Sequence, residues 1–216
     1  MKALVVGIGG LGCPAATALA LSGAFETIGI ADDDEVDITN LHRQILFDDG
    51  DVGKPKVPIA VDRLMKMAPL VTFVAHETRL LPDNAVDLVR KYDVVLEGSD
   101  NFPTKFLAAD ACKKAERSIV HAAAVRWHGT ALAVSPTGRP CYRCLFEDVP
   151  TDNAPNCAEA GVVGPMVGIV GAAQADLAIS IARGEDVHGT LFTFDGKSLS
   201  TRRRTIPSRA GCALCG

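Results

Sequence analysis

The chain has 216 residues, 48% of them hydrophobic and 22% charged, which suits one ordinary globular domain spanning residues 1–216. The formal net charge of −4 gives no basic excess and argues against a nucleic-acid-binding surface. No secretory signal is visible, and the most apolar stretch, Val162 to Ala182, contains Gln174 and Asp176, which predicts a buried helix rather than a membrane span. We expect a cytoplasmic protein, in which seven cysteines suggest metal binding or catalysis before disulfides.

Strands and helices are expected to alternate along the first half of the chain. The expected strands are Lys2–Val6, Thr27–Ala31, Val71–Ala75, Asp93–Leu96 and Ser118–His121. The expected helices are Cys13–Leu21, Pro58–Met67, Asn84–Arg90 and Pro103–Ala115. This alternation predicts an α/β fold with a Rossmann-like, doubly wound and mainly parallel sheet. Residues 37–56 are polar and irregular, which is typical of a functional loop.

The pattern changes after Trp127. Three further strands are expected, at Thr130–Val134, Leu191–Phe194 and Ser198–Arg202, with the apolar helix between the first and the second. They indicate a more antiparallel C-terminal portion of the same fold. The basic run in the last of these strands is interpreted as a solvated strand edge.

A glycine-rich turn follows the first strand. Gly7, Gly9 and Gly12 have the Gly-x-Gly-x-x-Gly spacing, and Gly10 is a further glycine within it. Glycines here permit a tight turn close to phosphates, and amides at the start of the next helix favour negative charge. Asp32 stands at the end of the second strand, where a carboxylate can accept hydrogen bonds from a ribose. The pattern predicts nucleotide binding, with a tight packing turn as the alternative.

Charged residues beyond the second and fourth strands favour a triphosphate over a dinucleotide. Arg43 and Gln44 follow the second strand, Lys54 and Lys56 lie in "GKPK", and Asp100 follows the fourth strand. Cationic side chains suit a triphosphate, and a carboxylate at that edge suits Mg²⁺, whereas ordinary surface charge is the alternative. The residues expected to bind the nucleotide are Gly7, Gly9, Gly10, Gly12, Asp32, Asp34, Asn40, Arg43, Gln44, Lys56, Asp100 and Asn101.

Two Cys-x-x-Cys pairs are the most specific motif in the chain. They are formed by Cys141 with Cys144 and by Cys212 with Cys215. Each pair can present two thiolates to one tetrahedral ion, so two pairs predict a closed structural zinc site that holds the C-terminus. A redox-active pair is the competing interpretation.

The remaining cysteines have different contexts. Cys13 and Cys112 lie in apolar helical segments and are expected in the core. Cys157 lies in the loop "NAPNCAEAG", where an exposed thiol could act as a nucleophile or be an incidental loop residue.

Seven motifs stand in order along the chain: "GIGGLGCPAA", "NLHRQ", "GKPK", "SDN", "CYRC", "GPMVGIVGAAQADLAI" and "CALCG". With them the chain resembles the ThiF/MoeB/HesA family, the bacterial relatives of ubiquitin-activating enzymes, from about Met1 to Gly216. The resemblance implies Mg-ATP-dependent adenylation of the C-terminal glycine of a ubiquitin-like sulfur-carrier protein, for thiamine, molybdopterin or related sulfur transfer. It also implies a homodimer and a structural zinc.

The resemblance further implies individual roles. Asp32 would hold the ribose of ATP, Arg43, Gln44 and Lys56 would contact its phosphates, and Asp100 would bind Mg²⁺ and position the carrier's carboxylate. Cys157 stands where some members carry a cysteine that receives the carrier or takes part in sulfur transfer. Residues 1–135 would then form the nucleotide-binding half, and residues 136–216 the half with the zinc, the crossover loop and the carrier-binding surface.

Two features differ from the family pattern. Relatives carry a helical segment before the first strand that sends an arginine into the partner subunit's ATP site, whereas this sequence begins at the strand. The family's "DNxxxR" is "DNFPTK" here, so Lys105 keeps the charge of the arginine without its bidentate fork. Two other functions therefore stay open: an NAD(P)-dependent oxidoreductase, which the glycine turn also suits, and a carrier-binding homologue with weak or lost activation.

Overall fold

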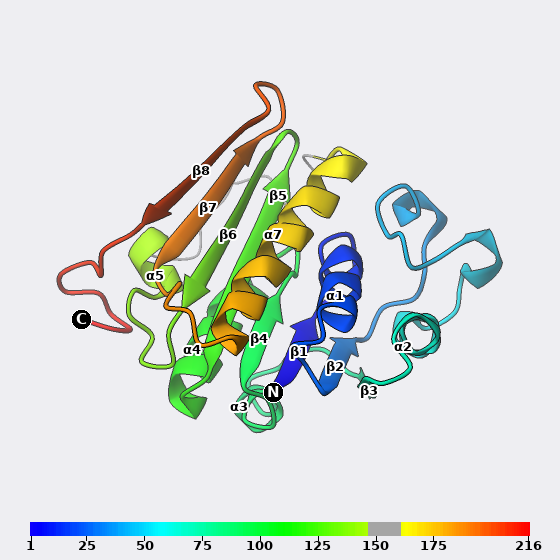
Figure 1. Cartoon of the computed structure of the whole chain (residues 1–216), viewed down its shortest axis with the longest axis horizontal. Helices are drawn as coiled ribbons and strands as arrows, with labels where there is room; N and C mark the ends of the chain where they lie inside the picture. Colours follow the sequence, from blue (N-terminus) through cyan, green and yellow to red (C-terminus); the bar gives the residue numbers. More distant parts are fainter. Residues whose placement is uncertain (147–160) are drawn as a thin grey trace.

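A computed structural model describes residues 1–146 and 161–216 of the chain. At its centre is one eight-stranded sheet with the order β3-β2-β1-β4-β5-β6-β7-β8 (Figure 1). The strands are β1 (Lys2–Val6), β2 (Thr27–Asp32), β3 (Thr72–Glu77), β4 (Val94–Glu97), β5 (Ser118–Val125), β6 (His128–Val134), β7 (Thr190–Asp195) and β8 (Ser200–Thr205). Pairing is parallel among β1 to β5 and antiparallel from β5 to β8. The expected α/β fold, with a parallel core and antiparallel C-terminal strands, is confirmed.

The strand order reverses at β1. The chain adds β2 and β3 on one side of β1 and then places β4 and β5 on the other side. In an open parallel sheet the ligand crevice forms at such a reversal, outside the carboxyl ends of the strands. The turns that follow β1 and β4 therefore meet at one crevice, although they are far apart in the sequence.

Two layers of helices cover the sheet. The helices are α1 (Gly12–Leu21), α2 (Lys56–Met67), α3 (Ala85–Val89), α4 (Phe102–Ala115), α5 (Tyr142–Leu145) and α7 (Gly164–Ala182). Buried side chains of α1, α2 and α7 share one hydrophobic cluster, and those of α3, α4 and α5 share a second. Successive strand residues face opposite sides, so Val94 and Leu96 of β4 join the first cluster and Val95 joins the second.

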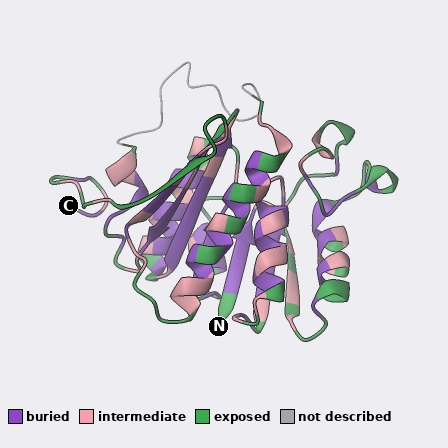
Figure 2. Ribbon diagram, turned by 45° about the horizontal axis from the view of Figure 1, so that its top comes forward, coloured by how far each residue is buried: buried purple, intermediate pink, exposed green. Residues whose placement is uncertain are grey.

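Helix α7 is the one helix in the described residues that is long and apolar enough to cross a membrane. It lies beside α1 on one face of the sheet, and its buried side includes Met166, Val170, Gln174 and Leu177 (Figure 1). Its outer side is exposed, whereas the strands beneath it are largely buried (Figure 2). This is the packing of a core helix, as the sequence predicts.

Several strand boundaries differ from the expected ones, and two of the differences have a local cause. β5 continues beyond the expected end at His121 because it forms a hairpin with β6, in which Val125 pairs with His128. β8 begins at Ser200 rather than Ser198, because the β7–β8 turn places Leu199 in the left-handed region with φ 52°. Residues 37–56 are mostly irregular, as expected, and contain the 3-10 turns η1 (Ile38–Asn40) and η2 (Asp49–Asp51).

Candidate functional site

A cavity of about 270 Å³ opens at the carboxyl ends of β1 and β4, where the strand order reverses. The glycine turn, the loop after β2 and the turn after β4 line it, and Val162 and Val167 contribute to its wall. It brings together every residue expected to bind the nucleotide except Gly12: Gly7, Gly9, Gly10, Asp32, Asp34, Asn40, Arg43, Gln44, Lys56, Asp100 and Asn101. They meet because parallel strands end at the same edge of the sheet.

The glycines of the turn have different reasons to be glycine. Gly7 has a φ of +85°, which side chains rarely adopt. A Cβ at Gly12 would lie 1.9 Å from the carbonyl oxygen of Gly7, so Gly12 permits the chain to fold back on itself beneath the cavity. A Cβ at Gly10 would lie 3.3 Å from Arg43. Gly12 therefore shapes the turn without lining the cavity.

Asp32 holds the floor of the cavity in place. Its Oδ2 accepts the backbone N–H of Ile8 at 2.7 Å, and its Oδ1 accepts that of Asp34 at 2.9 Å. Burial raises the pKa of Asp32, although the charge of Lys56 acts to lower it. A carboxylate has about four lone-pair sites, so acceptor capacity for a ribose hydroxyl remains.

Three cations of the described residues line the cavity, and one of them, Arg79, is already paired, because its Nε donates to Asp33 Oδ2 at 2.7 Å. The other two, Lys56 and Arg43, have few partners. Lys56 begins α2, and its buried Nζ lies 3.0 Å from Asp34 Oδ2. Arg43 donates to Asn40 Oδ1 and lies 3.3 Å from Nε2 of His42. An ammonium has three donors, and Lys56 uses one within the described residues, which leaves two for an anion.

Lys54, which the sequence placed beside Lys56 as a triphosphate candidate, points elsewhere. Its Nζ donates to the carbonyl oxygen of Gly50 at 2.7 Å, and it does not line the cavity.

Gln44 provides a direct test of whether the cavity fits a ligand. The residue is 4% exposed, and its Oε1 is buried without a hydrogen-bond partner in the described residues. A buried amide oxygen without a partner costs free energy. When the cavity is filled, we therefore expect either that the ligand donates a hydrogen bond to this oxygen or that the amide turns over, so that its oxygen and nitrogen exchange places. Gln44, the glycine turn, Arg43 and Lys56 together form a lining that fits a nucleotide.

Asp100 and Asn101 form the turn between β4 and α4. Asn101 is the N-cap of α4, because its Oδ1 accepts the N–H of Thr104 at 2.9 Å. Asp100 is exposed at the cavity, and within the described residues its carboxylate meets only Nδ2 of Asn101, at 3.4 Å. An open carboxylate at the edge of this cavity fits Mg²⁺, which prefers oxygen ligands.

Lys105 does not face the cavity. It is buried in α4, with its Nζ 2.8 Å from Glu97 Oε2 and 2.6 Å from the carbonyl oxygen of Ala122. The sequence predicts a fourth strand that ends at Leu96 and so places Glu97 in the turn after it. In the structure Glu97 is the last residue of β4 and is fully buried. A carboxylate at the end of the apolar run "DVVL" was the signal that could have identified this pair.

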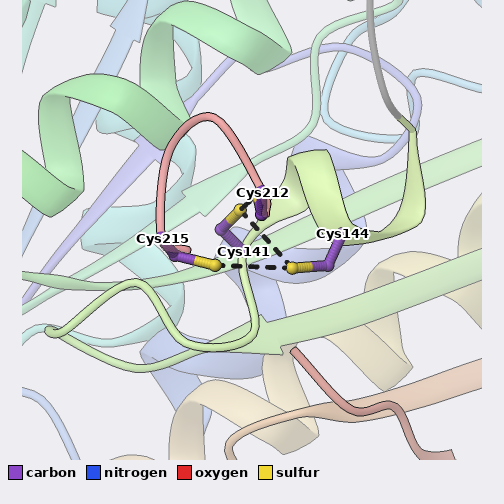
Figure 3. A group of neighbouring side chains, drawn as sticks. All are labelled: Cys141, Cys144, Cys212 and Cys215. Carbon is purple, nitrogen blue, oxygen red and sulfur yellow. Dashed lines mark hydrogen bonds between the residues drawn. The ribbon is translucent and has the colours of Figure 1, made fainter. Parts of the chain in front are cut away.

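The four cysteines of the two pairs come together at the C-terminus (Figure 3). Their Sγ atoms are 3.8 Å apart between Cys141 and Cys144, and 3.4 Å apart in both Cys141–Cys212 and Cys144–Cys215. Zinc–sulfur bonds of about 2.3 Å in a tetrahedron place sulfurs about 3.8 Å apart, so this spacing fits one zinc ion. The backbone N–H of Arg209 also donates to Cys144 Sγ, at 3.3 Å, and a hydrogen bond of this kind orients a metal-binding side chain.

Short helix α5 begins directly after Cys141 and contains Cys144, and it was not expected from the sequence. The structure thus confirms the cysteine cluster itself.

The other cysteines differ in accessibility. Cys13 and Cys112 are fully buried, as expected, and burial raises the pKa of the Cys13 thiol to about 12. Cys157 lies outside the described residues.

Comparisons with known proteins agree with this geometry. The profile of the ThiF family matches residues 1–214. The chain belongs to the ThiF family. It is 38% identical over 221 residues to the sulfur carrier protein adenylyltransferase of Thermus thermophilus, covering 99% of this chain and 81% of that relative.

Other relatives of this ThiF-family chain are longer. It is 39% identical over 216 residues to the adenylyltransferase and sulfurtransferase MOCS3 of Culex quinquefasciatus, covering 98% of this chain and 49% of the relative. It is 40% identical over 231 residues to the adenylyltransferase and sulfurtransferase uba4 of Emericella nidulans, covering 99% and 48%. The chain therefore spans about half the length of these two curated relatives.

Solved structures of E. coli MccB share the fold. MccB with ATP has a TM-score of 0.83 and 21% identity, covering 100% of this chain and 66% of that chain. MccB with succinimide has a TM-score of 0.85 at 21% identity, with the same coverage. At this identity the likeness concerns the fold alone.

Proposed function

We propose that this ThiF-family chain adenylates the C-terminal glycine of a ubiquitin-like sulfur-carrier protein with Mg-ATP. The observation that carries the proposal is the meeting of Arg43, Lys56 and Asp100 in one cavity above the glycine turn. The printed names of the Thermus, Culex and Emericella relatives, all adenylyltransferases, support it.

The residue types match the needs of the reaction. A carboxylate oxygen of the carrier attacks the α-phosphorus of ATP, the bond to the oxygen bridging to the β-phosphate breaks, and its electron pair leaves with pyrophosphate. The protein must align the two anions and neutralise the charge that grows on the leaving group. Arg43 and Lys56 supply fixed positive charge at the cavity wall. Asp100 would hold Mg²⁺, which adds positive charge on the phosphate oxygens.

We assign a structural role to the cysteine cluster. A closed site of four thiolates leaves no open coordination position for catalysis, so zinc there would join α5 to the C-terminal turn. Assembly as a homodimer, a cytoplasmic location and a carrier-accepting role for Cys157 belong to the same proposal, on the strength of the family resemblance and composition.

Carrier-dependent ATP–pyrophosphate exchange tests the proposal. The chain is incubated with ATP, labelled pyrophosphate and a small carrier protein ending in Gly-Gly, and label entering ATP is counted. We expect exchange that requires the carrier and Mg²⁺, and that Asp100→Asn abolishes. Asp83→Asn is the matched control, because Asp83 is exposed and outside the cavity. Absence of exchange in well-folded wild-type protein with every candidate carrier would reject the function.

Two alternatives make different predictions. An NAD(P)-dependent oxidoreductase would be protected from thermal unfolding by NAD(P) and not by Mg-ATP. A carrier-binding homologue without activation would bind the carrier and show no exchange. Substitution of lysine for arginine at position 105 favoured that homologue, but the Lys105 ammonium is 2.8 Å from buried Glu97 rather than in the cavity. This removes Lys105 as a reason to expect lost activation.

A further inference from the structure

Glu97 connects the turn that carries Asp100 to the interior of the protein. Its Oε1 accepts the backbone N–H of Ser99 at 2.7 Å and also the hydroxyl of Ser99. Its Oε2 lies 2.8 Å from Lys105 Nζ and 3.3 Å from Nδ1 of His121. One buried carboxylate therefore connects the first residues after β4 to α4 and to β5.

Lys105 anchors the other end of this contact. It lies on α4, whose N-cap is Asn101, and its Nζ also donates to the carbonyl oxygen of Ala122 in β5. Its side chain is 5% exposed, so its charge is available to Glu97 and β5 rather than to the cavity. Because α4 begins at the turn itself, the ammonium fixes both the strand before the turn and the helix after it.

A second contact holds the same strand end from the opposite face of the sheet. Gln174 of α7 donates from Nε2 to the carbonyl oxygens of Glu97, at 2.9 Å, and Val120, at 2.7 Å. The backbone of Glu97 is thus held by α7 and its side chain by α4, in the position directly before the turn.

The buried ion pair between Glu97 and Lys105 is not explained by stability alone. A buried ion pair is weak evidence for stability, because its desolvation cost offsets much of the attraction and apolar residues of similar size can replace it. Burial raises the pKa of Glu97, yet the Lys105 charge and the His121 contact outweigh this effect and hold it at about 2. The carboxylate is therefore ionised where it accepts the Ser99 N–H. Glu97 lies three residues before Asp100 in the chain.

We propose that Glu97 and Lys105 are positioning residues, which hold the Ser99–Asn101 turn so that Asp100 faces the nucleotide cavity. This inference rests on the proposed adenylation for its catalytic consequence. Among the described residues that line the cavity, neither Glu97 nor Lys105 occurs. Their effect is transmitted through the backbone of Ser99 and the start of α4.

The test measures the kinetics of ATP–pyrophosphate exchange in a double variant, a conservative variant and a control variant. Glu97→Leu/Lys105→Met removes both charges together, so it leaves no unpaired buried ion, and it also removes the acceptor of the Ser99 N–H. Lys105→Arg keeps the charge, and Lys114→Met removes an exposed lysine from the same helix. Exchange rates are recorded as a function of ATP concentration and of Mg²⁺ concentration. Folding of each variant is checked by circular dichroism and thermal unfolding.

We expect the double variant to fold and to lose about 10- to 100-fold in kcat, which is the typical cost of losing groups that hold a metal ligand in position. The Mg²⁺ concentration for half-maximal rate should rise by a similar factor, with KM for ATP changed less than about threefold. Lys105→Arg should recover most of the rate, and Lys114→Met should match the wild type. A folded double variant with wild-type kcat and Mg²⁺ requirement overturns the inference.

Amide hydrogen exchange separates this inference from the proposed function. In the wild type the Ser99 N–H is bound to Glu97 and should exchange slowly, and the double variant should lose at least tenfold of that protection while Lys114→Met does not. Unchanged Ser99 protection in the double variant contradicts the positioning role, whatever the activity. Absence of carrier-dependent exchange in the wild type instead rejects the adenylation on which the catalytic part depends.

Discussion

Acid should destabilise this protein partly through Glu97. Its pKa in the folded chain is about 2, against an ordinary value of 4.5, so the folded state binds fewer protons than the unfolded state between these values. Stability from this group is therefore fully present above about pH 4.5 and is lost as the pH falls toward 2. Glu97→Leu/Lys105→Met removes the effect without leaving either ion buried alone.

The magnitude follows from the two pKa values. One pH unit corresponds to about 1.4 kcal/mol, so the difference between 4.5 and about 2 is worth about 3 kcal/mol in total. The linkage relation places about 2 kcal/mol of this loss between pH 7 and pH 3. Other carboxylates with lowered pKa values, such as Asp37 beside Thr39, are present in both proteins and cancel in the comparison.

Urea unfolding of the wild type and the double variant at pH 7, 5, 4 and 3 provides the measurement. The free energy of unfolding of the wild type should fall relative to the variant by about 2 kcal/mol from pH 7 to pH 3. Most of the change should lie below pH 5. A difference between the two proteins that is constant across this range would refute the assignment of Glu97 as a buried ionised partner of Lys105.

Three further predictions concern the cavity and the cysteine cluster. Lys56→Met should raise the KM for ATP about 10- to 100-fold, as expected for a hydrogen bond to a charged group, whereas Lys54→Met should leave it unchanged in the same exchange assay. Gly12→Ala should unfold below the wild-type temperature and lose nucleotide binding, because its Cβ would meet Gly7 O at 1.9 Å. Gly168→Ala, in α7, should instead stabilise by about 0.5–1 kcal/mol, because, apart from its chain neighbours and the helix backbone around it, no atom of the described residues lies within 4 Å of the added Cβ. Metal analysis should find one zinc per chain, and chelation should lower the unfolding temperature; wild-type stability after complete chelation would argue against a structural zinc.

Much of the fold could be predicted because its signals are local. The run Lys2–Val6, the glycines after it and the helix that follows are recognisable from apolar pattern and turn chemistry alone. The extension of β5 to Val125 could not be read in this way, because pairing with β6 decides it. Helix α5 was missed for a similar reason, since it is one short turn that carries Cys144, and the cysteine cluster forms only in the folded chain.

The sequence by itself determined which chemistry the chain carries: a glycine turn after a strand, cations after β2, an aspartate after β4 and two Cys-x-x-Cys pairs. These signals survive because turns, strand ends and metal ligands depend on residue type and short spacing. Only the tertiary structure decided what each charge faces. In the sequence Lys54 is a candidate for contact with a triphosphate and Lys105 stands in place of a family arginine. In the structure Lys54 points to Gly50 and Lys105 to Glu97, because the direction of a long side chain is set by the residues packed around it.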